Sequence, residues 1–497
     1  MLSQDLVRYR AEWFESLADA RRDILAGMVG TFALIPEVIA FSFVAGVDPQ
    51  VGLFASFVIG IVIAIAGGRP AMISGAAGSV ALVVGALVHA HGLQYLLAAT
   101  VLGGLLQIVF GLLKLDVLLC FVSRSVRTGF VNALAILIFS AQVPQMLGVT
   151  WHTYALIALG LAIIYLAPRF IAWLPSPLIC ILVLTGVSMA LPMSVHTVSD
   201  LGQLPASLPV FSLPRVPLDW ATLRIIAPYS LAIAAVGLLE SLMTAAVVDD
   251  LTETTSNKSR ESTGLGLANV AAGLFGGIAG CGMIGQTVGN VRYGGRGRLS
   301  TMTAGVFLLV VLVPLRAWVA QVPVAALVAI MVMVSISTFS WGSLRDLVHH
   351  PKMSSMVMLV TVAVTVATHD LSAGVAVGVL LSGVFFAFKV TRMMQVTVTY
   401  DPESDTRHYT VSGQIFFASA DIFADHFDLR DRAGRAHIDL SDAHLWDVTA
   451  VGALEGVVDT LRRHGTLVEL VGLNQASAVL VDRHAPLVRA EPGAVSG

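Results

Sequence analysis

Long apolar runs occupy the chain between residues 24 and 395, and short polar loops separate them. A window of about 19 residues, which suits membrane-spanning helices, places the runs at 24–47, 51–66, 79–89, 95–113, 126–147, 154–167, 177–191, 222–247, 265–278, 286–292, 301–319, 322–339, 353–368 and 371–395. A proline-rich polar stretch at 192–219 divides them into two sets of seven. The pattern predicts an α-helical membrane protein with about 14 transmembrane segments in two halves.

Glycine-rich breaks at 73–79 and 280–287 precede two of the shorter runs. These runs have fewer than the roughly 20 residues that a straight spanning helix needs. Irregular backbone is tolerated at membrane depth only where it is buried in protein or lines a cavity. Short segments in corresponding places of two halves are typical of transporters whose site is built from half-helices. The breaks are therefore the predicted site, and the N–H groups at each half-helix start favour an anion.

The composition excludes most alternatives to a membrane protein. Hydrophobic residues make up 56% of the chain and charged residues 12%, and a water-soluble globule of this composition would expose large apolar patches. Cys120, Cys180 and Cys281 lie in or beside apolar runs and are too few and scattered for a disulfide framework. We expect small buried cysteines, and nothing indicates a nucleic-acid partner.

Residues 1–23 are polar and show no signal-peptide pattern, so we expect them to stay in the cytoplasm. Cytoplasmic loops of membrane proteins carry an excess of Lys and Arg. Alternating crossings from an inner N-terminus leave only Arg215, Arg224 and Arg316 in the outer loops. An even number of crossings also places the C-terminus inside. The expected location is the inner (plasma) membrane, crossed many times, with both termini cytoplasmic.

A soluble domain is predicted at 396–497, after the transmembrane domain at 24–395, because polar alternation replaces the long apolar runs. Strands are expected at 396–400, 409–416, 437–440 and 466–471, and helices at 419–432 and 449–464. This small α/β domain has no catalytic constellation, so we expect neither an enzyme nor a cofactor. Asp439, Asp442 and Asp447 are interpreted as turn formers or N-caps rather than as metal ligands.

The stretch 280–285 reads Gly-Cys-Gly-Met-Ile-Gly and has the spacing of a dinucleotide-binding loop. Such a loop belongs to a βαβ unit with an acidic residue about 20 positions further on. Residues 299–315 are apolar and contain no carboxylate, so we reject a dinucleotide site. The glycines either let the backbone approach an anion or let helices pack closely.

Several residue sets resemble one family. One set resembles the first-segment signature of the sulfate permease family of anion transporters; it contains Ala26, Gly27, Pro36, Ala40, Ala45, Gly46, Pro49, Gly52 and Leu53. The ninth and tenth segments of that family are similar, in order and spacing, to the set Gly264, Asn269, Gly276, Gly277, Gly282, Thr287, Asn290, Gly294, Gly295 and Arg296. The soluble end resembles a STAS domain, the anti-sigma-factor-antagonist module that family members carry.

The resemblance covers nearly the whole chain and implies two inverted repeats of seven segments. It implies a core domain that holds the substrate and a gate domain that forms the dimer or scaffold surface, so we expect a homodimer in the lipid bilayer. In such a fold the third and tenth segments meet head-on, each as a short strand followed by a half-helix. The breaks at 73–79 and 280–287 fall in these two segments.

Two carboxylates fall inside predicted spans: Glu37 in the first and Glu240 midway through the eighth. A carboxylate in a membrane segment is costly unless it functions or has a partner, and no Lys or Arg lies deep in a span to pair with either. Protonation keeps such groups neutral, so both are predicted to be proton-coupling residues. The alternative is a hydrogen-bonding residue beside a water-filled vestibule.

The predicted substrate-binding residues are Phe41, Phe43, Gly78, Ser79, Gly285, Gln286 and Thr287. Gln286 stands where many relatives have Arg at the start of the tenth half-helix, so the site lacks a fixed positive charge. This departure favours a carboxylate or dicarboxylate over sulfate. In the STAS-like domain Thr449 aligns with the loop where bacterial relatives carry a phosphorylatable Ser, which makes it a candidate regulatory residue, although N-capping by Asp447 or Thr449 explains it as well.

The sequence therefore predicts a secondary active anion transporter that works by proton-coupled symport. An uncoupled exchanger or channel for sulfate, bicarbonate or chloride would use the same fold. A membrane anchor that presents the STAS-like domain to partners is the more distant alternative. Glu37 and Glu240 favour coupling over a channel, and the glycine breaks disfavour an anchor, which would need only uninterrupted helices.

Overall fold

The computed structural model describes residues 12–13, 16–115, 122–171, 176–191, 195–217, 219–349, 352–428 and 433–485. The chain divides into two compact units, Met1–Val379 and Leu380–Gly497. Cys120 and residues 1–11 of the predicted N-terminal segment lie outside the described residues. The change of composition at Gln395 coincides with the first strand of the second unit.

Each predicted apolar run corresponds to one helix. The first half contains α2 (Leu17–Val44), α3 (Pro49–Ala66), α4 (Gly78–His91), α5 (Leu93–Leu112), α6 (Arg124–Met146), α7 (Trp151–Leu166) and α8 (Ser176–Ala190). The second half contains α10 (Trp220–Thr252), α11 (Lys258–Leu274), α12 (Ile284–Arg292), α13 (Arg298–Val319), α14 (Val324–Thr338), α16 (Lys352–Thr368) and α17 (Leu371–Thr391). Short pieces lie in the connections: η2 (Ala167–Arg169), α9 (Val198–Leu201) and α15 (Gly342–His349). Among the described residues, seven helices are long and apolar enough to cross a bilayer, or eight if the bent α13 is one span.

Polar residues at the loop ends explain where several helices begin. Asp219 accepts a hydrogen bond from the backbone N–H of Thr222 at 2.7 Å and caps α10. Asn257 caps α11 in the same way, through the N–H of Arg260 at 2.9 Å. Pro49 occupies the first position of α3, where a missing N–H costs no helical hydrogen bond. These caps satisfy N–H groups that have no partner inside the helix.

The two glycine-rich breaks form a small antiparallel sheet. Strand β1 (Ser74–Ala76) precedes α4, and strand β2 (Gly280–Gly282) precedes α12. Gly75 faces Cys281 in the register of the pair. A Cβ atom at Gly280 would lie 2.0 Å from the carbonyl oxygen of Gly75, so only glycine allows this approach. The predicted pair of half-helices is confirmed, and each half-helix starts directly after one strand.

Side chains from neighbouring helices satisfy the backbone of the breaks. Asn269 brackets Gly280: its Oδ1 accepts from the backbone N–H at 2.8 Å and its Nδ2 donates to the carbonyl at 3.1 Å. At Gly282 two residues share this role: the Ser241 hydroxyl accepts from the backbone N–H, and the Thr244 hydroxyl donates to the carbonyl, each at 2.8 Å. Buried backbone groups without partners are costly in an apolar surrounding. These side chains therefore make the breaks possible.

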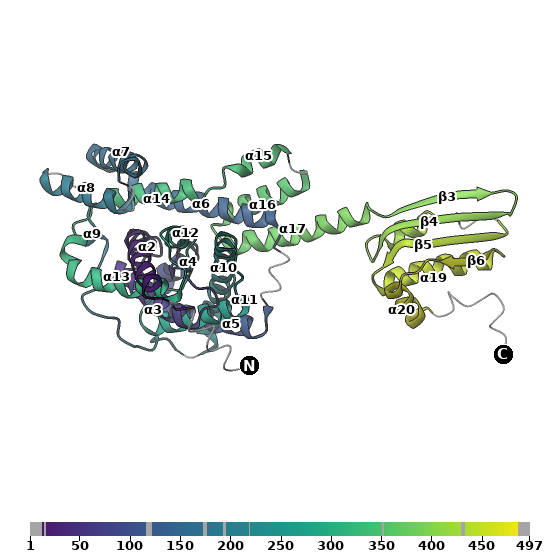
Figure 1. The fold of residues 1–497 in the computed structure, drawn as a ribbon, viewed down its shortest axis with the longest axis horizontal. Coiled ribbons are helices and arrows are strands. Elements are labelled where there is room, and N and C mark those ends of the chain that lie inside the picture. Colours follow the sequence, from purple (N-terminus) through teal and green to yellow (C-terminus); the bar gives the residue numbers. More distant parts are fainter. Residues whose placement is uncertain are drawn as a thin grey trace. The chain divides into compact units, whose positions relative to one another are not determined.

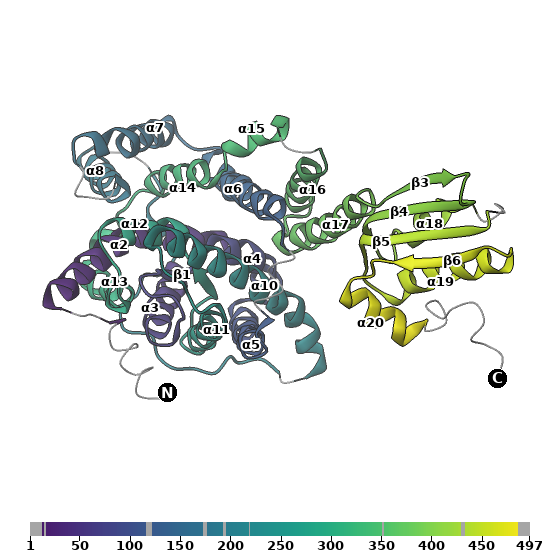
Figure 2. The same cartoon turned by 45° about the vertical axis from the view of Figure 1, so that its right-hand side comes forward.

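The helices of the first unit form two groups. The core group contains α2, α3, α4, α5, α10, α11, α12 and α13, and the gate group contains α6, α7, α8, α14 and α16. Figures 1 and 2 both show the gate group along one side of the core group. The two groups meet where α2 packs against α8 and α14, and where α4 packs against α6. The family resemblance implied a division of this kind.

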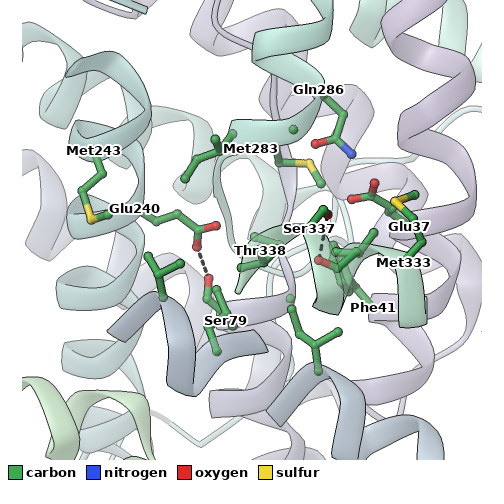
Figure 3. Close-up of a pocket in the computed structure, with 18 of the residues that line it drawn as sticks. Glu37, Phe41, Ser79, Glu240, Met243, Met283, Gln286, Met333, Ser337 and Thr338 are labelled. Carbon is green, nitrogen blue, oxygen red and sulfur yellow. Dashed lines mark hydrogen bonds between the residues drawn. The ribbon is translucent and has the colours of Figure 1, made fainter. Parts of the chain in front are cut away.

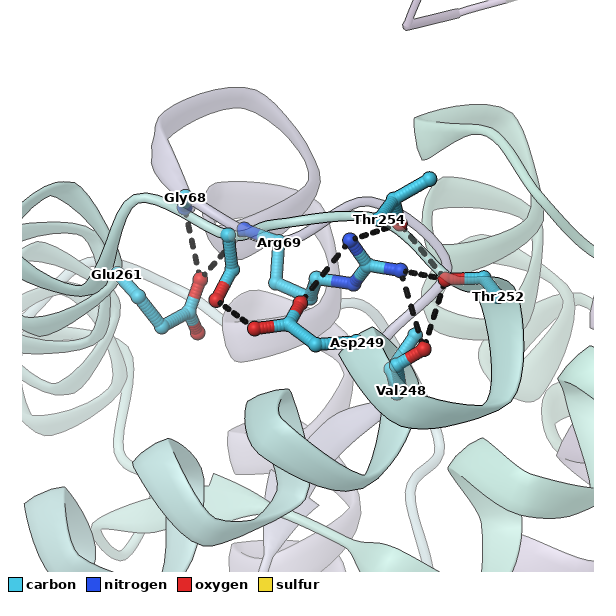
Figure 4. Close-up of polar contacts among 8 residues, drawn as sticks. Gly68, Arg69, Val248, Asp249, Thr252, Thr254 and Glu261 are labelled. Atoms are coloured by element: carbon cyan, nitrogen blue, oxygen red, sulfur yellow. Dashed lines mark hydrogen bonds and ion pairs between the residues drawn. The ribbon is translucent and has the colours of Figure 1, made fainter.

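A polar cluster holds the turn between α3 and β1 to the second half of the chain (Figure 4). Glu261 at the start of α11 accepts hydrogen bonds from the backbone N–H groups of Gly68 and Arg69, at 2.7 and 3.0 Å. The guanidinium of Arg69 donates to Thr254 at 2.8 Å and lies 3.2 Å from a carboxylate oxygen of Asp249. The ends of α3, α10 and α11 are thereby fixed to one another.

The second unit contains a four-stranded sheet in the order β3-β4-β5-β6. Its elements are β3 (Gln395–Asp401), β4 (Thr406–Ile415), α18 (Ala420–Asp425), β5 (Arg435–Leu445), α19 (Val448–Arg463), β6 (Leu467–Val471) and α20 (Gln475–His484). Strands β3 and β4 are antiparallel, and the pairs β4–β5 and β5–β6 are parallel. Leu454 and Val458 of α19 are buried in one apolar cluster with Ile438 and Leu440 of β5.

The helix predicted at 419–432 is shorter than expected. Helix α18 ends at Asp425, and Phe427 is buried with its ring stacked 4.5 Å from that of Tyr409. The free energy gained by burying the Phe427 ring exceeds what further helical hydrogen bonds would contribute, so the helix ends before it. Residues 429–432 of the prediction lie outside the described residues. Helix α20 had no counterpart in the prediction.

The β1–β2 pair leads to a first prediction. Gly280→Ala should destabilise the protein, because the new methyl group would overlap the Gly75 carbonyl, and overpacking of this kind costs about 1–3 kcal/mol. Gly289→Ala is the control, since no atom lies within 4 Å of its Cβ position. Thermal unfolding of the two purified variants measures the difference. Equal melting temperatures would show that the close approach of the strands is not required.

Candidate functional site

A cavity of about 290 Å³ lies where the half-helices meet the gate group. From the core group it is lined by α2, α4, α10 and α12, and from the gate group by α6, α8 and α14 (Figure 3). Its lining residues are Glu37, Phe41, Ala77, Gly78, Ser79, Phe130, Val131, Leu134, Ile138, Pro177, Glu240, Met243, Met283, Ile284, Gly285, Gln286, Met333, Val334, Ser337 and Thr338. Residues from both halves of the chain thus converge on one space.

One carboxyl group of the cavity is paired with a hydroxyl. Ser79, at the start of α4, donates a hydrogen bond to Oε2 of Glu240 on α10. Ser79 is buried, and its oxygen also lies 4.0 Å from the sulfur of Cys281 in β2. The acid of the second half is therefore held by the half-helix of the first half.

The other carboxyl group faces an amide. Glu37 on α2 and Gln286 on α12 both line the cavity, and their side chains lie beside each other (Figure 3). Figure 3 shows the Gln286 nitrogen turned towards the Glu37 carboxylate. Gln286 is 4% exposed, so its amide has little access to solvent as a hydrogen-bond partner. This pair mirrors the first, because an acid of the first half meets the half-helix of the second half.

The charge of the cavity is negative when its acids are ionised. Glu37 and Glu240 are the ionisable side chains among the described lining residues, and no Lys, Arg or His is among them. At the starts of α4 and α12, backbone N–H groups without intrahelical partners and the helix dipole provide positive potential. The ionised carboxyl groups and the helix starts therefore contribute potentials of opposite sign to the cavity.

Seven of the predicted site residues line the cavity: Glu37, Phe41, Gly78, Ser79, Glu240, Gly285 and Gln286. Phe43 and Thr287 are not among the lining residues. Thr287 is buried, and its hydroxyl accepts from the N–H of Ile73 at 3.0 Å, so it fixes the break that leads into β1. Phe41 packs against α4, since a Cβ at Gly78 would lie 2.6 Å from its ring.

Several lining residues were not predicted. They are chiefly contributed by the gate group and include Phe130, Met333, Ser337 and Thr338. Met243 and Met283 add two further thioethers from the core group. These residues lie in uniformly apolar or weakly polar runs, and nothing in their local sequence distinguishes them from residues that pack in the core or face lipid.

In the second unit the candidate regulatory residue Thr449 is exposed in the first turn of α19. Asp447, rather than Thr449, is the N-cap: its Oδ1 accepts from the N–H of Ala450 at 2.9 Å. Its Oδ2 accepts from the N–H of Phe417 at 2.8 Å. Asp439 and Asp442 lie within β5, so their interpretation as turn formers or N-caps is wrong. Asp439 accepts from the N–H of Ser441 at 2.9 Å, beside an irregularity in the pairing of β4 with β5.

Comparison with known proteins identifies the architecture. The model described as "Sulfate permease family" matches residues 21–157 and 149–361, and a "STAS domain" model matches residues 398–485. The chain belongs to the sulfate permease family. This sulfate permease is 50% identical to the "Putative sulfate transporter YbaR" of Bacillus subtilis (strain 168) over 476 residues, which cover 96% of this chain and 98% of the relative.

Relatives of known structure share the fold. The permease is 26% identical to "The transmembrane domain of a cyanobacterium bicarbonate transporter BicA", with a TM-score of 0.66 over 73% of this chain and 98% of that chain. "The overall structure of SLC26A9" covers 93% of this chain and 86% of that chain with a TM-score of 0.81, and at 16% identity this likeness shows the fold alone. The protein is a membrane anion transporter of this family with a C-terminal STAS domain, as the sequence predicted.

The cavity can be tested by filling it. Gly285 lines the cavity, and no atom lies within 4 Å of its Cβ position, so Gly285→Leu should fold normally and occupy the space. We expect anion uptake to fall by about tenfold or more, equivalent to about 1.4 kcal/mol or more of lost binding. Gly289→Leu, one turn further along α12 and outside the cavity lining, is the matched control. Unchanged uptake by a well-folded Gly285→Leu would place the site elsewhere.

Proposed function

We propose that this sulfate permease is a proton-coupled symporter of a small anion and that the cavity between α4 and α12 is its substrate site. The observation that carries the proposal is the presence of Glu37 and Glu240 in a cavity whose described lining contains no basic side chain. An anion that enters at the half-helix starts must share this space with both carboxyl groups. Their protonation therefore controls its binding.

The magnitude of the repulsion supports the coupling. At an effective dielectric constant of about 20, two unit negative charges about 6 Å apart repel by on the order of 3 kcal/mol. A protonated carboxyl group removes this repulsion and adds a hydrogen-bond donor. Because binding couplings are reciprocal, a proton that favours the anion is itself favoured by the anion. The loaded cavity then carries both across the membrane together.

The lining favours a carboxylate or dicarboxylate over sulfate. Sulfate concentrates two charges on one compact centre, and Gln286 supplies no fixed charge to balance them. The apolar side chains of Phe41, Phe130 and Met333 suit the carbon skeleton of an organic anion. The relatives are named for sulfate and bicarbonate, so both anions belong in every test panel.

The position of the cavity between the core group and the gate group supports alternating access, in which one group moves against the other around the site. We propose a homodimer in the inner (plasma) membrane, with the gate group as the dimer surface. We propose that both termini are cytoplasmic, because Lys and Arg are concentrated in the loops that this orientation puts inside.

An uncoupled anion exchanger or channel is the second candidate. The Ser79 hydroxyl donates to Glu240 and so stabilises its ionised form without a proton. A membrane anchor for the STAS domain receives less support, because it would not need the β1–β2 pair or the buried side chains that hold it.

The coupling is tested by removing both acids. Glu37→Gln combined with Glu240→Gln fixes neutral side chains of the same shape, so the double variant should still exchange one anion for another. It should lose accumulation driven by an inward proton gradient. Uptake into proteoliposomes of succinate, bicarbonate, sulfate and chloride, with and without that gradient, measures both properties. A double variant that still concentrates an anion in response to the gradient would favour the uncoupled candidate or another proton site.

Thr449 is proposed as a regulatory position. A phosphate in the first turn of α19 places negative charge where the helix dipole favours it. Thr449→Glu should stabilise α19 by about 0.3–1 kcal/mol and alter the transport rate, whereas Thr449→Lys should have the opposite effect on the helix. Hydrogen exchange of residues 448–463 and uptake in the full-length protein measure the two effects. Equal uptake by Thr449→Glu and Thr449→Ala would remove the regulatory role.

A further inference from the structure

The two carboxyl groups of the cavity have partners of different chemistry. Ser79 offers Glu240 a hydroxyl, whose donor and acceptor lie on one oxygen. Rotation of the hydroxyl hydrogen alone, with the oxygen in place, lets it donate to a carboxylate or accept from a carboxylic acid. The side chain of Gln286 lies beside Glu37 in Figure 3 and offers it an amide, whose donor and acceptor lie on two separate atoms. Protonation of the two acids therefore has different consequences for the rest of the cavity.

The orientation of the Gln286 amide matches an ionised Glu37. Figure 3 shows the amide nitrogen turned towards the carboxylate and the amide oxygen turned away from it. An outward oxygen is an acceptor and repels an anion. A protonated Glu37 donates a hydrogen bond instead, so its best partner is the amide oxygen. The last torsion of a glutamine side chain is broad and nearly two-fold, and half a turn about it exchanges the two atoms.

We propose that Glu37 and Gln286 form a proton-dependent anion ligand, in which protonation of Glu37 turns the Gln286 amide so that its NH₂ group binds the anion beside the N–H groups at the start of α12. The inference rests on the substrate site proposed above and adds which acid carries the proton linked to binding. It also explains how a site with Gln286 can dispense with a fixed charge. The Gln286 amide presents its NH₂ group, the positive end of its dipole, to the anion only when Glu37 is protonated.

The surroundings of Glu37 contain few competing charges. Glu240 is the other ionisable group among the described residues that line the cavity. The described elements that pack against α2 carry further titratable groups, none of which is among the lining residues: His89 and His91 on α4, Cys180 on α8, Arg292 on α12, and Arg298 and Arg316 on α13. A pH dependence of binding in this cavity therefore belongs to Glu37 or Glu240, and variants of each separate the two.

The test is anion binding to the purified full-length protein in detergent, measured by calorimetry with succinate, bicarbonate, sulfate and chloride from about pH 4.5 to about pH 8, a range that begins near the ordinary pKa of a Glu side chain. One linked proton predicts that wild-type affinity rises about tenfold for each unit of acidification above the titration. Glu37→Gln should bind with little pH dependence, because its amide can donate permanently to the Gln286 oxygen. Gln286→Met, which keeps the length of the side chain, should bind about tenfold more weakly at acidic pH and change less with pH than the wild type, because only the direct charge repulsion from Glu37 remains. Glu240→Gln should keep the wild-type pH dependence.

The outcomes separate this inference from the proposed function. Wild-type binding that does not change with pH, or Gln286→Met binding that keeps the wild-type slope, would overturn the inference while leaving anion transport intact. A slope lost in Glu240→Gln but kept in Glu37→Gln would assign the proton to the other acid and also overturn it. Binding with the expected slopes in a protein that fails to accumulate anions in liposomes would support the inference and contradict the coupled function. If none of the four anions binds at any pH, both fall.

Discussion

The structure depends on satisfying a broken backbone inside an apolar surrounding. At β1 and β2 the chain leaves the helical hydrogen-bonding pattern, and each peptide group there needs a partner that lipid cannot provide. The two strands supply part of the pairing to each other. Two side chains supply further hydrogen bonds. Asn269 on α11 pairs with the backbone of Gly280 in β2, and Thr287 on α12 accepts from the backbone N–H of Ile73, next to β1. The helical scaffold is arranged so that these side chains reach the breaks.

This constraint also creates the site. A half-helix that starts inside the helical unit leaves its first N–H groups without intrahelical partners, and two such starts face one cavity. The acids on α2 and α10 complete the arrangement, since Glu37 meets Gln286 and Glu240 meets Ser79 across the two halves of the chain. In the proposed function, the same backbone breaks that are costly for the fold provide the attraction for the anion. The acids provide the means to regulate it.

The sequence was informative wherever a local pattern decides the structure. The apolar runs located the helices, because segments that cross a membrane are predominantly apolar. The glycines located the breaks, because a residue with a Cβ atom at position 280 would overlap the carbonyl of Gly75. Rotation of the helices could not be predicted. Phe41 and Phe43 lie about 200° apart around α2, and only tertiary packing determines that Phe41 lines the cavity. The gate residues were missed for the same reason, since their neighbours lie far away in the chain.

The central claim is that the anion binds between the starts of α4 and α12. The most direct measurement is a cryo-EM map of the protein in lipid nanodiscs, recorded at acidic pH with a saturating concentration of a transported anion. The account predicts ligand density in contact with Gly285 and the side chain of Gln286, across the cavity from Ser79. Density for the anion outside this cavity, with the space between the half-helices filled by side chains or water alone, would contradict it.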